Sequence, residues 1–582
     1  MICVTQLATI IETLNANEDV CFCKVEIFSS RYISVYEGTI GSKWVIKIAF
    51  PPYFPVQLPD IYVNSAPVGT LHIGSDGKLC LFNKSSILLD TANPVGIVSE
   101  CISTALDILS LCPGTQEYLS ELKKEFSAYW DNNCKICIYC SLEMDEIEFA
   151  EIPILKVSNV LYVISHSIIE SKRLLHDVLR ISNTDADAEG KALVVRLRDD
   201  ADLLSPFKKL SWQAFTNYLK RNVTKSASKK LSAYICRQHK NQNKRREIIV
   251  AIFPNGDNAL IFGFATDFQL LSKPMISIPN ASYQAAIKRI DYDYMTKRSG
   301  AESRLQNKHV LLLGCGSVGG FIANNLCQLG ITKLDLVDDD ILLLDNVHRH
   351  FLGADAARSK GSRNKADLLG NTLSNKYIHV EIDTLSYVDR DVASIFFSSN
   401  RWNNYDLIIS ALGEPTINLE INRRLRDAES NTPFITCFNE PYGIGGHVIA
   451  LNLSHSQDSC LQCLYTLGDD DGMGFRGSFV ESGQSFEMSL SGCAGTFVPY
   501  SSLDSQQTAL HVARTAIKVL MGQISYNCLI SWKGDATTLV DLGFRTSNRF
   551  QTLESDVTVV DNLKNENCYV CSPKRHGDQN DI

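Results

Sequence analysis

Three glycines in the spacing G-x-G-x-x-G, Gly314, Gly316 and Gly319, follow a short hydrophobic run. Glycine allows the backbone to approach a phosphate closely, and a helix that begins at such a turn offers free N–H groups and the positive end of its dipole. Asp338 follows a second hydrophobic run, where an acceptor for a ribose hydroxyl is expected. These residues predict a site for an adenine nucleotide.

Polar and cationic residues continue this pattern beyond Asp338. Asn346, Arg349 and Lys365 add an amide and two cations where the phosphates of a nucleotide would lie. A triphosphate needs such a cluster, whereas NAD carries only a pyrophosphate, so we interpret the motif as an ATP site. A nucleotide-binding dehydrogenase, or a copy that has lost its activity, is the alternative interpretation.

Four further residues form two C-x-x-C pairs, Cys460 with Cys463 and Cys568 with Cys571. Each pair supplies two thiolates at the spacing of a tetrahedral zinc site, and a closed site of four thiolates leaves no open position for catalysis. We therefore predict one structural Zn²⁺. A redox-active C-x-x-C is the alternative.

Hydrophobic periodicity predicts the elements that place these residues. Around the glycine motif, a strand at 310–313, a helix at 321–329 and a strand at 333–337 form a β-α-β unit, and a helix is expected at 506–521. Near the N-terminus, β-rich runs lie between an amphipathic segment and two helices, in the order 4–14, 21–28, 32–39, 44–50, 61–63, 94–111 and 116–130. The middle of the chain alternates strand-like and helical runs at 193–197, 212–219, 248–253 and 259–264.

At 582 residues the chain is too long for one hydrophobic core, so we expect an α/β multidomain protein. The expected parts are an α+β domain, an α/β linker domain, a Rossmann-like domain and a polar, disordered tail, at 1–135, 136–285, 286–575 and 576–582. The stretch 220–246 holds ten Lys and Arg and no acidic residue. We interpret it as a solvated surface around a loop, with a partner-binding or nucleic-acid patch as the alternative.

From about 286 to 575 the chain resembles the adenylation domain of the ThiF/MoeB and ubiquitin-activating superfamily. The resemblance implies that Asp338 holds the ribose and that Arg349 and Lys365 hold phosphates. A protein C-terminal carboxylate then attacks the α-phosphate. In MoeB-like enzymes a Thr-Asp-Asn assists Mg²⁺, but this chain has Leu412-Gly-Glu414, so Glu414 is the local carboxylate that could replace the aspartate.

Some activating enzymes of this superfamily carry a thioester cysteine in a loop just before the closing helix. Cys493 lies in that place, within Ser491-Gly-Cys-Ala-Gly495. The resemblance therefore implies that Cys493 accepts the acyl group. Cys437 and Cys528 are alternatives, as is a purely structural role for Cys493.

The first 135 residues resemble the ubiquitin-conjugating fold, through the proline-rich turn 51–63 and the loop Leu71-His-Ile-Gly-Ser-Asp-Gly-Lys-Leu-Cys80. An acyl-carrier thiol must be accessible and able to reach its thiolate form. The resemblance implies that Cys80 receives the activated protein and hands it to an amine. Ile73 and Gly74 stand where the family has Pro and Asn, so the oxyanion lacks its usual asparagine, and the candidates to replace it are His72 or a backbone N–H.

Conjugating and activating modules in one chain resemble the bacterial fusion proteins of CBASS anti-phage operons. That resemblance implies a cGAS/DncV-like nucleotidyltransferase as acyl donor, target lysines as acceptors, and a homodimer formed through the adenylation domain. A ubiquitin-like protein as donor is an alternative, as is a sulfur-carrier activating enzyme. A third hypothesis is a non-catalytic scaffold that senses ATP.

Composition excludes several other classes. The net charge of −9 argues against general nucleic-acid affinity, and no apolar run reaches the roughly 18 residues of a membrane span. The N-terminus has no basic and apolar signal segment, and 19 cysteines without such a signal indicate thiols in a reducing cytoplasm.

Overall fold

The computed structural model describes 4–16, 20–41, 43–82, 87–144, 147–178, 187–240, 246–256, 258–271, 276–358, 361, 363–385, 401–453, 459–467, 473–489, 496–524 and 526–571. These residues belong to two compact units. The first unit comprises 1–171 and 185–288, and the second comprises 172–184 and 289–582.

The N-terminal part of the first unit is a four-stranded antiparallel sheet in the order β1-β2-β3-β4. Its strands are Cys21–Val25, Ser34–Ile40, Trp44–Phe50 and Asp60–Val63. Helices α1 (Val4–Asn15) and α2 (Pro94–Ser110) cover one face, because their apolar stripes pack with the inward side chains of β2 and β3. The expected helix-sheet-helix order of this region is confirmed.

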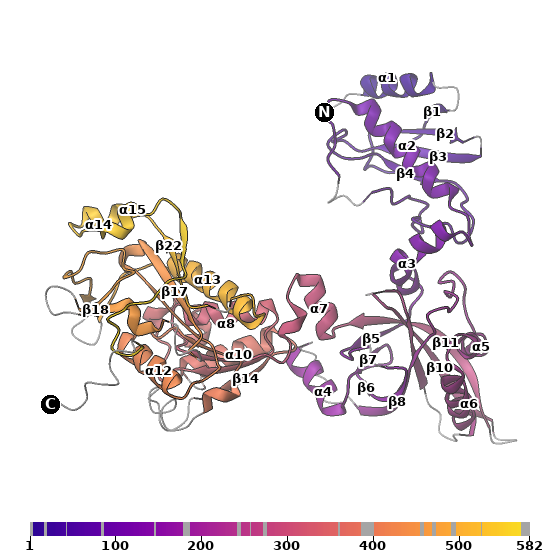
Figure 1. The fold of residues 1–582 in the computed structure, drawn as a ribbon. Coiled ribbons are helices and arrows are strands. Elements are labelled where there is room, and N and C mark those ends of the chain that lie inside the picture. The colour runs from indigo at the N-terminus through magenta and orange to yellow at the C-terminus, as the bar shows by residue number, and fades with distance from the viewer. Residues whose placement is uncertain are drawn as a thin grey trace. The chain divides into compact units, whose positions relative to one another are not determined.

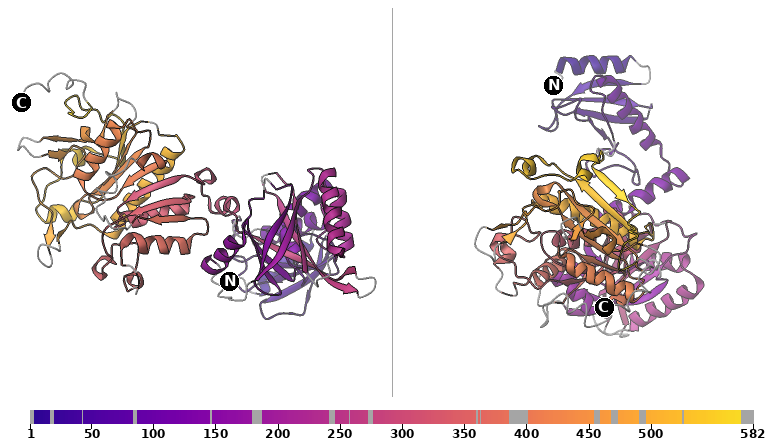
Figure 2. Two further views of the ribbon diagram at one scale, coloured as in Figure 1. Left: turned by 90° about the horizontal axis from the view of Figure 1, so that it is seen from below. Right: turned by 60° about the vertical axis from the view of Figure 1, so that its left-hand side comes forward.

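The remainder of the first unit is a closed barrel in the order β10-β11-β5-β7-β6-β8-β9. In chain order its strands β5 to β11 are Ile136–Cys140, Phe149–Lys156, Leu161–Ile164, Asp187–Arg196, Arg246–Phe253, Leu260–Leu271 and Ile276–Arg289. Alternation along β8 sends Ala192 and Val194 inward and Leu193 and Val195 outward. Helices α5 (Trp212–Asn222) and α6 (Lys225–Lys240) pack on that outer face, as Figure 2 shows.

Helix α3 (Gln116–Asp131) connects the two parts of this unit. Its first half packs Tyr118 and Leu122 against Leu71, and its second half places Phe126 and Trp130 in the outer barrel core. The Trp130 indole Nε1 donates to the Ala285 carbonyl of β11 at 3.1 Å. The loop that precedes Cys80 therefore rests on a helix anchored in the barrel.

The second unit is built on an eight-stranded sheet in the order β14-β13-β12-β15-β16-β17-β22-β23. These strands are, in the same order, Glu381–Thr384, Lys333–Val337, His309–Leu313, Leu407–Ser410, Phe434–Asn439, Gly445–Leu451, Cys528–Lys533 and Val557–Val560. The five strands from β14 to β16 are parallel, and β17, β22 and β23 continue antiparallel.

Helices cover both faces of this sheet (Figure 1). One face packs against α8 (Gly319–Leu329), α10 (Lys365–Lys376) and α13 (Ser502–Leu520), and the other packs against α12 (Pro415–Asp427). Shorter elements of this unit are α7 (Tyr292–Ser299), α9 (Ala354–Ala357), α14 (Thr537–Asp541), α15 (Asn548–Thr552) and the hairpin β18 (Tyr465–Leu467) with β19 (Met473–Phe475).

The predicted β-α-β unit is confirmed, with β13 at the predicted residues and α8 beginning two residues earlier, at Gly319. The interpretation of 220–246 as a loop surface is wrong for most of its length. Helix α6 occupies 225–240, because its apolar residues Ala227, Leu231 and Tyr234 recur at helical spacing and are buried on the barrel. Among the helices that the structure describes, none combines the length and the apolar character that a bilayer span requires.

Replacing Trp130 with Ala should destabilise the first unit, because it removes a buried ring and leaves the Ala285 carbonyl without its donor. The expected loss of unfolding free energy is about 3–5 kcal/mol, and Trp130→Phe should lose less because the ring volume is largely kept. Scanning calorimetry of the full chain measures this as a lower transition temperature for one unit only. Unchanged transitions in Trp130→Ala would show that α3 is not part of the barrel core.

Candidate active site

The turn between β12 and α8 requires glycine at two positions. Gly314 has a φ of +88°, and a Cβ there would lie 3.0 Å from the backbone of Ala411. A Cβ on Gly319 would lie 1.9 Å from the Gly314 carbonyl oxygen. A side chain at Gly316 would meet open space, so this glycine instead leaves the backbone uncovered. The turn therefore presents bare backbone at the start of α8.

Two side chains hold this turn through the backbone of Cys315. The Asp338 carboxylate accepts from the Cys315 N–H at 2.6 Å, and His350 Nε2 lies 2.7 Å from the Cys315 carbonyl oxygen. His350 Nδ1 accepts from the Leu352 N–H at 3.0 Å, so Nε2 carries the proton and donates. Sequence reasoning missed His350, whose only signal is its place directly after Arg349.

Burial shifts the pKa of both holding groups. Burial lowers the pKa of His350 to about 4, and the nearby Lys365 and Arg349 cations act in the same direction, so the neutral imidazole persists at neutral pH. Burial raises the pKa of Asp338, while its bond from Cys315 and the charge of Lys365 oppose that rise. Asp338 thus supports the turn, in addition to the ribose contact that we predict for it.

A cavity of about 610 Å³ opens beside this turn. It brings together six of the residues singled out in the sequence, namely Gly316, Asn346, Arg349, Lys365, Glu414 and Cys437. Its wall also includes Ser317, His350, Asn418, Phe438, Asn439, Tyr465, Phe475, Glu487, Phe497 and Tyr500. The cavity is not lined by Gly314, Gly319 or Asp338. The two glycines belong to the turn, and Asp338 accepts a hydrogen bond from it.

The cationic side chains of the cavity are held by local structure. Asn364 caps α10 by accepting from the Asp367 N–H at 3.1 Å, which fixes Lys365 at the first position of that helix. Lys365 Nζ lies 2.7 Å from Asp340 Oδ2, with the lysine side chain only 12% exposed and the aspartate 71% exposed. Arg349 is half-buried, with its guanidinium 5.9 Å from the Phe497 ring centroid. Both cations can therefore reach an anion in the cavity.

Of the three candidate thioester cysteines of this unit, the structure describes two. Cys493 belongs to 490–495, which lie outside the described residues. Cys437 lines the cavity but is buried, and burial raises its pKa to about 12. Cys528 is buried in β22, where burial raises its pKa to about 11. Neither alternative offers a thiolate near neutral pH.

Cys80 is exposed at the end of a tight loop. Its N–H donates to the His72 carbonyl at 2.7 Å, and the His72 N–H donates to Tyr129 Oη of α3 at 2.5 Å. His72 has a φ of +57°, and its ring lies 3.5 Å from Glu121 of α3. The Lys124 ammonium, followed by His72, holds the pKa of Glu121 below its usual range. Helix α3 thus positions the loop that carries the thiol.

The usual asparagine of this loop has no direct replacement at its own position. Gly74 occupies it, and the Gly74 N–H is already used in a bond to the Lys78 carbonyl at 2.8 Å. That backbone donor is therefore engaged within the turn.

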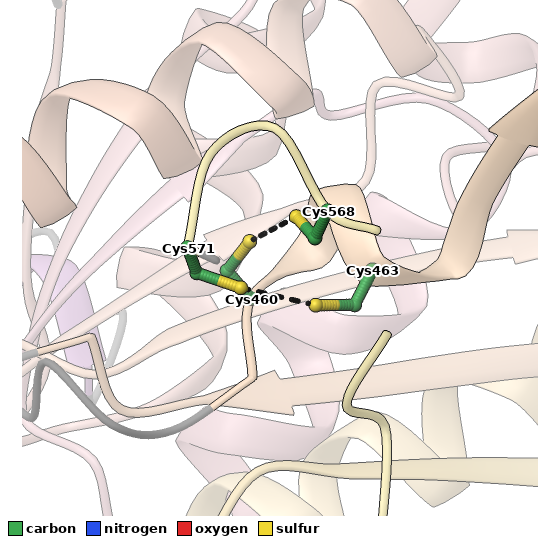
Figure 3. A group of neighbouring side chains, drawn as sticks. All are labelled: Cys460, Cys463, Cys568 and Cys571. Atoms are coloured by element: carbon green, nitrogen blue, oxygen red, sulfur yellow. Dashed lines mark hydrogen bonds between the residues drawn. The ribbon is translucent and has the colours of Figure 1, made fainter. Parts of the chain in front are cut away.

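The two C-x-x-C pairs form one cluster, shown in Figure 3. The four sulfur atoms of Cys460, Cys463, Cys568 and Cys571 all lie within 4.8 Å of one another. The distance from Cys460 Sγ to Cys568 Sγ is 3.7 Å, and that from Cys463 Sγ to Cys571 Sγ is 3.2 Å. A zinc ion bonded to four sulfurs at about 2.3 Å separates them by about 3.8 Å, whereas a disulfide needs about 2.05 Å. The donor set and its spacing fit zinc.

Comparison with known proteins finds two families in this chain. Residues 290–538 match the ThiF family, and residues 26–138 match the prokaryotic E2 family B. The ATP-dependent ubiquitin transferase-like protein Cap2 of Pseudomonas aeruginosa is 24% identical over 484 residues, which are 78% of this chain and 78% of that protein. The protein of the same name from Escherichia coli is 26% identical over 220 residues, 37% of this chain and 35% of that protein.

Among solved structures, that of E. coli MccB with ATP aligns at 16% identity and a TM-score of 0.32, covering 46% of this chain and 68% of that chain. This similarity is too low to carry an argument. The family matches define a chain that contains a ThiF-family domain and an E2-like domain. It is an enzyme of the ubiquitin-activating and ubiquitin-conjugating kind, with the predicted α/β multidomain fold.

The full-length protein should bind one zinc ion through the four cysteines. Changing Cys568 and Cys571 to Ser should remove the metal and destabilise the second unit by several kcal/mol, because zinc binding contributes about 10–16 kcal/mol in finger peptides. Elemental analysis and calorimetry measure both effects. Cys112→Ser, an exposed thiol of the first unit, is the matched control. Well-folded wild-type protein without zinc would contradict the assignment.

Proposed function

We propose that this chain uses ATP to activate the C-terminal carboxylate of a protein and conjugates that protein to amines. The observation that carries the proposal is the cavity of a ThiF-family domain, in which Gly316, Arg349 and Lys365 come together beside the bare backbone of the glycine turn. This arrangement supplies backbone donors and two cations for a triphosphate. Asn346 adds an amide to the same wall.

In the first step a carboxylate oxygen of the protein substrate attacks the α-phosphorus of ATP. The bond between the α-phosphorus and the bridging oxygen breaks, so that pyrophosphate leaves and an acyl adenylate remains. Arg349 and Lys365 stabilise the charge that develops on the phosphate oxygens. Asp338 holds the ribose. Glu414, at the cavity wall, would help to hold a magnesium ion, which neutralises phosphate charge when bound.

In the second step the Cys493 thiolate attacks the acyl carbonyl, AMP leaves, and a thioester forms. Cys80 then takes the acyl group by thioester exchange and passes it to a lysine amine. The exposure of Cys80 supports its role, since both transfers require access to the sulfur. Fusion of the two modules keeps the second thiol at an effective concentration in about the millimolar range.

The donor that we propose is a cGAS/DncV-like nucleotidyltransferase encoded beside this chain, in an anti-phage operon of the CBASS type. Target lysines are the acceptors, and the chain works in the cytoplasm as a homodimer that binds neither membrane nor nucleic acid. The Cap2 proteins to which the chain is similar are named as ATP-dependent ubiquitin transferase-like proteins, which supports ATP-dependent conjugation of a protein.

Replacing Arg349 or Lys365 with Ala should reduce ATP–pyrophosphate exchange by about 100-fold or more, because each removes a cation from the transition-state phosphates. The exchange is measured with the neighbouring nucleotidyltransferase as donor, and the same donor lacking its last residues is the blank. Arg423→Ala, which changes an exposed cation on α12, should leave exchange unchanged. Normal exchange in both cavity variants would refute the adenylation site.

The two proposed carrier thiols should act in series. Cys80→Ala should abolish transfer to amines yet still form an adduct on Cys493 that thiol reductants release. Cys493→Ala should leave both cysteines unloaded while the adenylate still forms. Mass spectrometry of the intact chain after incubation with ATP and donor measures both, with Cys112→Ala as control. If Cys493→Ala charges Cys80 at the normal rate, the relay through Cys493 is wrong and direct transfer from the adenylate takes its place.

A further inference from the structure

Three backbone donors around Cys80 are already used within its loop. The Cys80 N–H donates to the His72 carbonyl at 2.7 Å, and the Gly74 N–H donates to the Lys78 carbonyl at 2.8 Å. The His72 N–H donates to Tyr129 Oη of α3 at 2.5 Å. Acyl transfer at Cys80 passes through a tetrahedral intermediate with a negative oxygen, which requires a donor that is not engaged elsewhere. These three N–H groups do not meet that requirement.

The Tyr129 hydroxyl, in contrast, retains a proton that it can donate. A phenol is both donor and acceptor, and Tyr129 Oη is the acceptor for the His72 N–H. Among the residues that the structure describes, none accepts the Tyr129 hydroxyl proton in return. The other tyrosine of α3 differs, because the Tyr118 hydroxyl donates to the Gly69 carbonyl at 2.7 Å. Tyr129 is therefore the tyrosine of α3 with a donor to offer.

The short hairpin of this loop brings Tyr129 to the residue that faces Cys80. Ile73 and Leu79 form an antiparallel bridge, so His72 and Cys80 are the next opposed pair along its two arms. In a regular pair the two residues exchange both hydrogen bonds. Here the Cys80 N–H bonds to the His72 carbonyl, but the His72 N–H bonds to Tyr129 Oη and not to Cys80. The phenol oxygen therefore meets the hairpin directly opposite the proposed acyl-carrier residue.

The surroundings of the half-buried Tyr129 ring fix its position and keep it protonated. Its ring centroid lies 5.0 Å from that of Phe207, which belongs to the segment before α5. Burial raises the pKa of Tyr129, the bond from His72 opposes that rise, and the charges of Glu125 and Cys80 add to it. The phenol is therefore a neutral donor at neutral pH, and the Cys80 sulfur is close enough for its charge to act on the phenol.

We propose that the Tyr129 hydroxyl donates a hydrogen bond to the oxyanion that forms when an amine attacks the thioester on Cys80. The amine nitrogen bonds to the carbonyl carbon, and the π electrons of the carbonyl group move to its oxygen, which Tyr129 stabilises. Collapse of this intermediate breaks the C–S bond, so that Cys80 leaves as thiolate and the proton of the attacking amine passes to water. This assignment rests on the conjugation proposed above, and it gives α3 the role of the asparagine that the loop lacks.

The transfer step can be measured separately from activation. The full-length chain is charged with ATP and the neighbouring nucleotidyltransferase, ATP is removed, and free lysine is added as the amine. Tyr129→Phe keeps the ring beside Phe207 and loses only the hydroxyl, so amide formation should slow by about 100-fold, the usual effect of losing one oxyanion donor. Tyr118→Phe is the matched control, because it removes a hydroxyl that only holds the loop, and it should have little effect.

A fluorinated tyrosine at position 129 separates donation from holding the loop. Its phenol ionises at lower pH, and the phenolate still accepts from the His72 N–H but has no proton to donate. The rate of amide formation relative to wild type should therefore fall as the pH rises through this ionisation, which ultraviolet absorbance follows.

A ratio that does not change with pH, or equal losses in Tyr129→Phe and Tyr118→Phe, would overturn this assignment alone. Absence of a thioester on Cys80 in the wild-type chain would overturn the conjugation proposal and this assignment with it.

Discussion

The proposed nucleotide site of the second unit depends on how the glycine turn after β12 is held in place. Gly319 has no room for a side chain against the Gly314 carbonyl, and the N–H and carbonyl of Cys315 are each bound by a side chain, Asp338 and His350. Held from both sides, the turn keeps its backbone facing the cavity. Because His350 is neutral, it donates to the turn without adding a further positive charge.

The two thiol sites illustrate opposite uses of cysteine. Cys460 and Cys463 are buried with Cys568 at distances that fit a closed metal site, which joins residues far apart in the chain. Cys80, in contrast, is exposed on a loop that is held by Tyr129 of α3, and α3 is anchored in the barrel. The barrel therefore has at least one structural role, which is to support the helix behind the proposed acyl-carrier loop.

Local patterns in the sequence predicted the elements, and spacing alone predicted the cysteine cluster, because both depend on neighbouring residues. The helix over 225–240 was missed because its many cations resemble a solvated loop, while the apolar stripe from Ala227 to Tyr234 is short. His350 was missed for a different reason. Its role depends on the carbonyl of Cys315, which lies 35 positions away in the sequence and which only the folded chain brings close.

The most direct measurement follows oxygen from the substrate carboxylate. If the donor carries ¹⁸O in its C-terminal carboxyl group, adenylation by attack on the α-phosphorus makes that oxygen the bridge to AMP, and thiol attack then releases it with AMP. A single-turnover reaction analysed by mass spectrometry should therefore yield one ¹⁸O in AMP and none in pyrophosphate. Label in pyrophosphate or phosphate, or AMP that contains no ¹⁸O, would contradict activation of a protein carboxylate at this site.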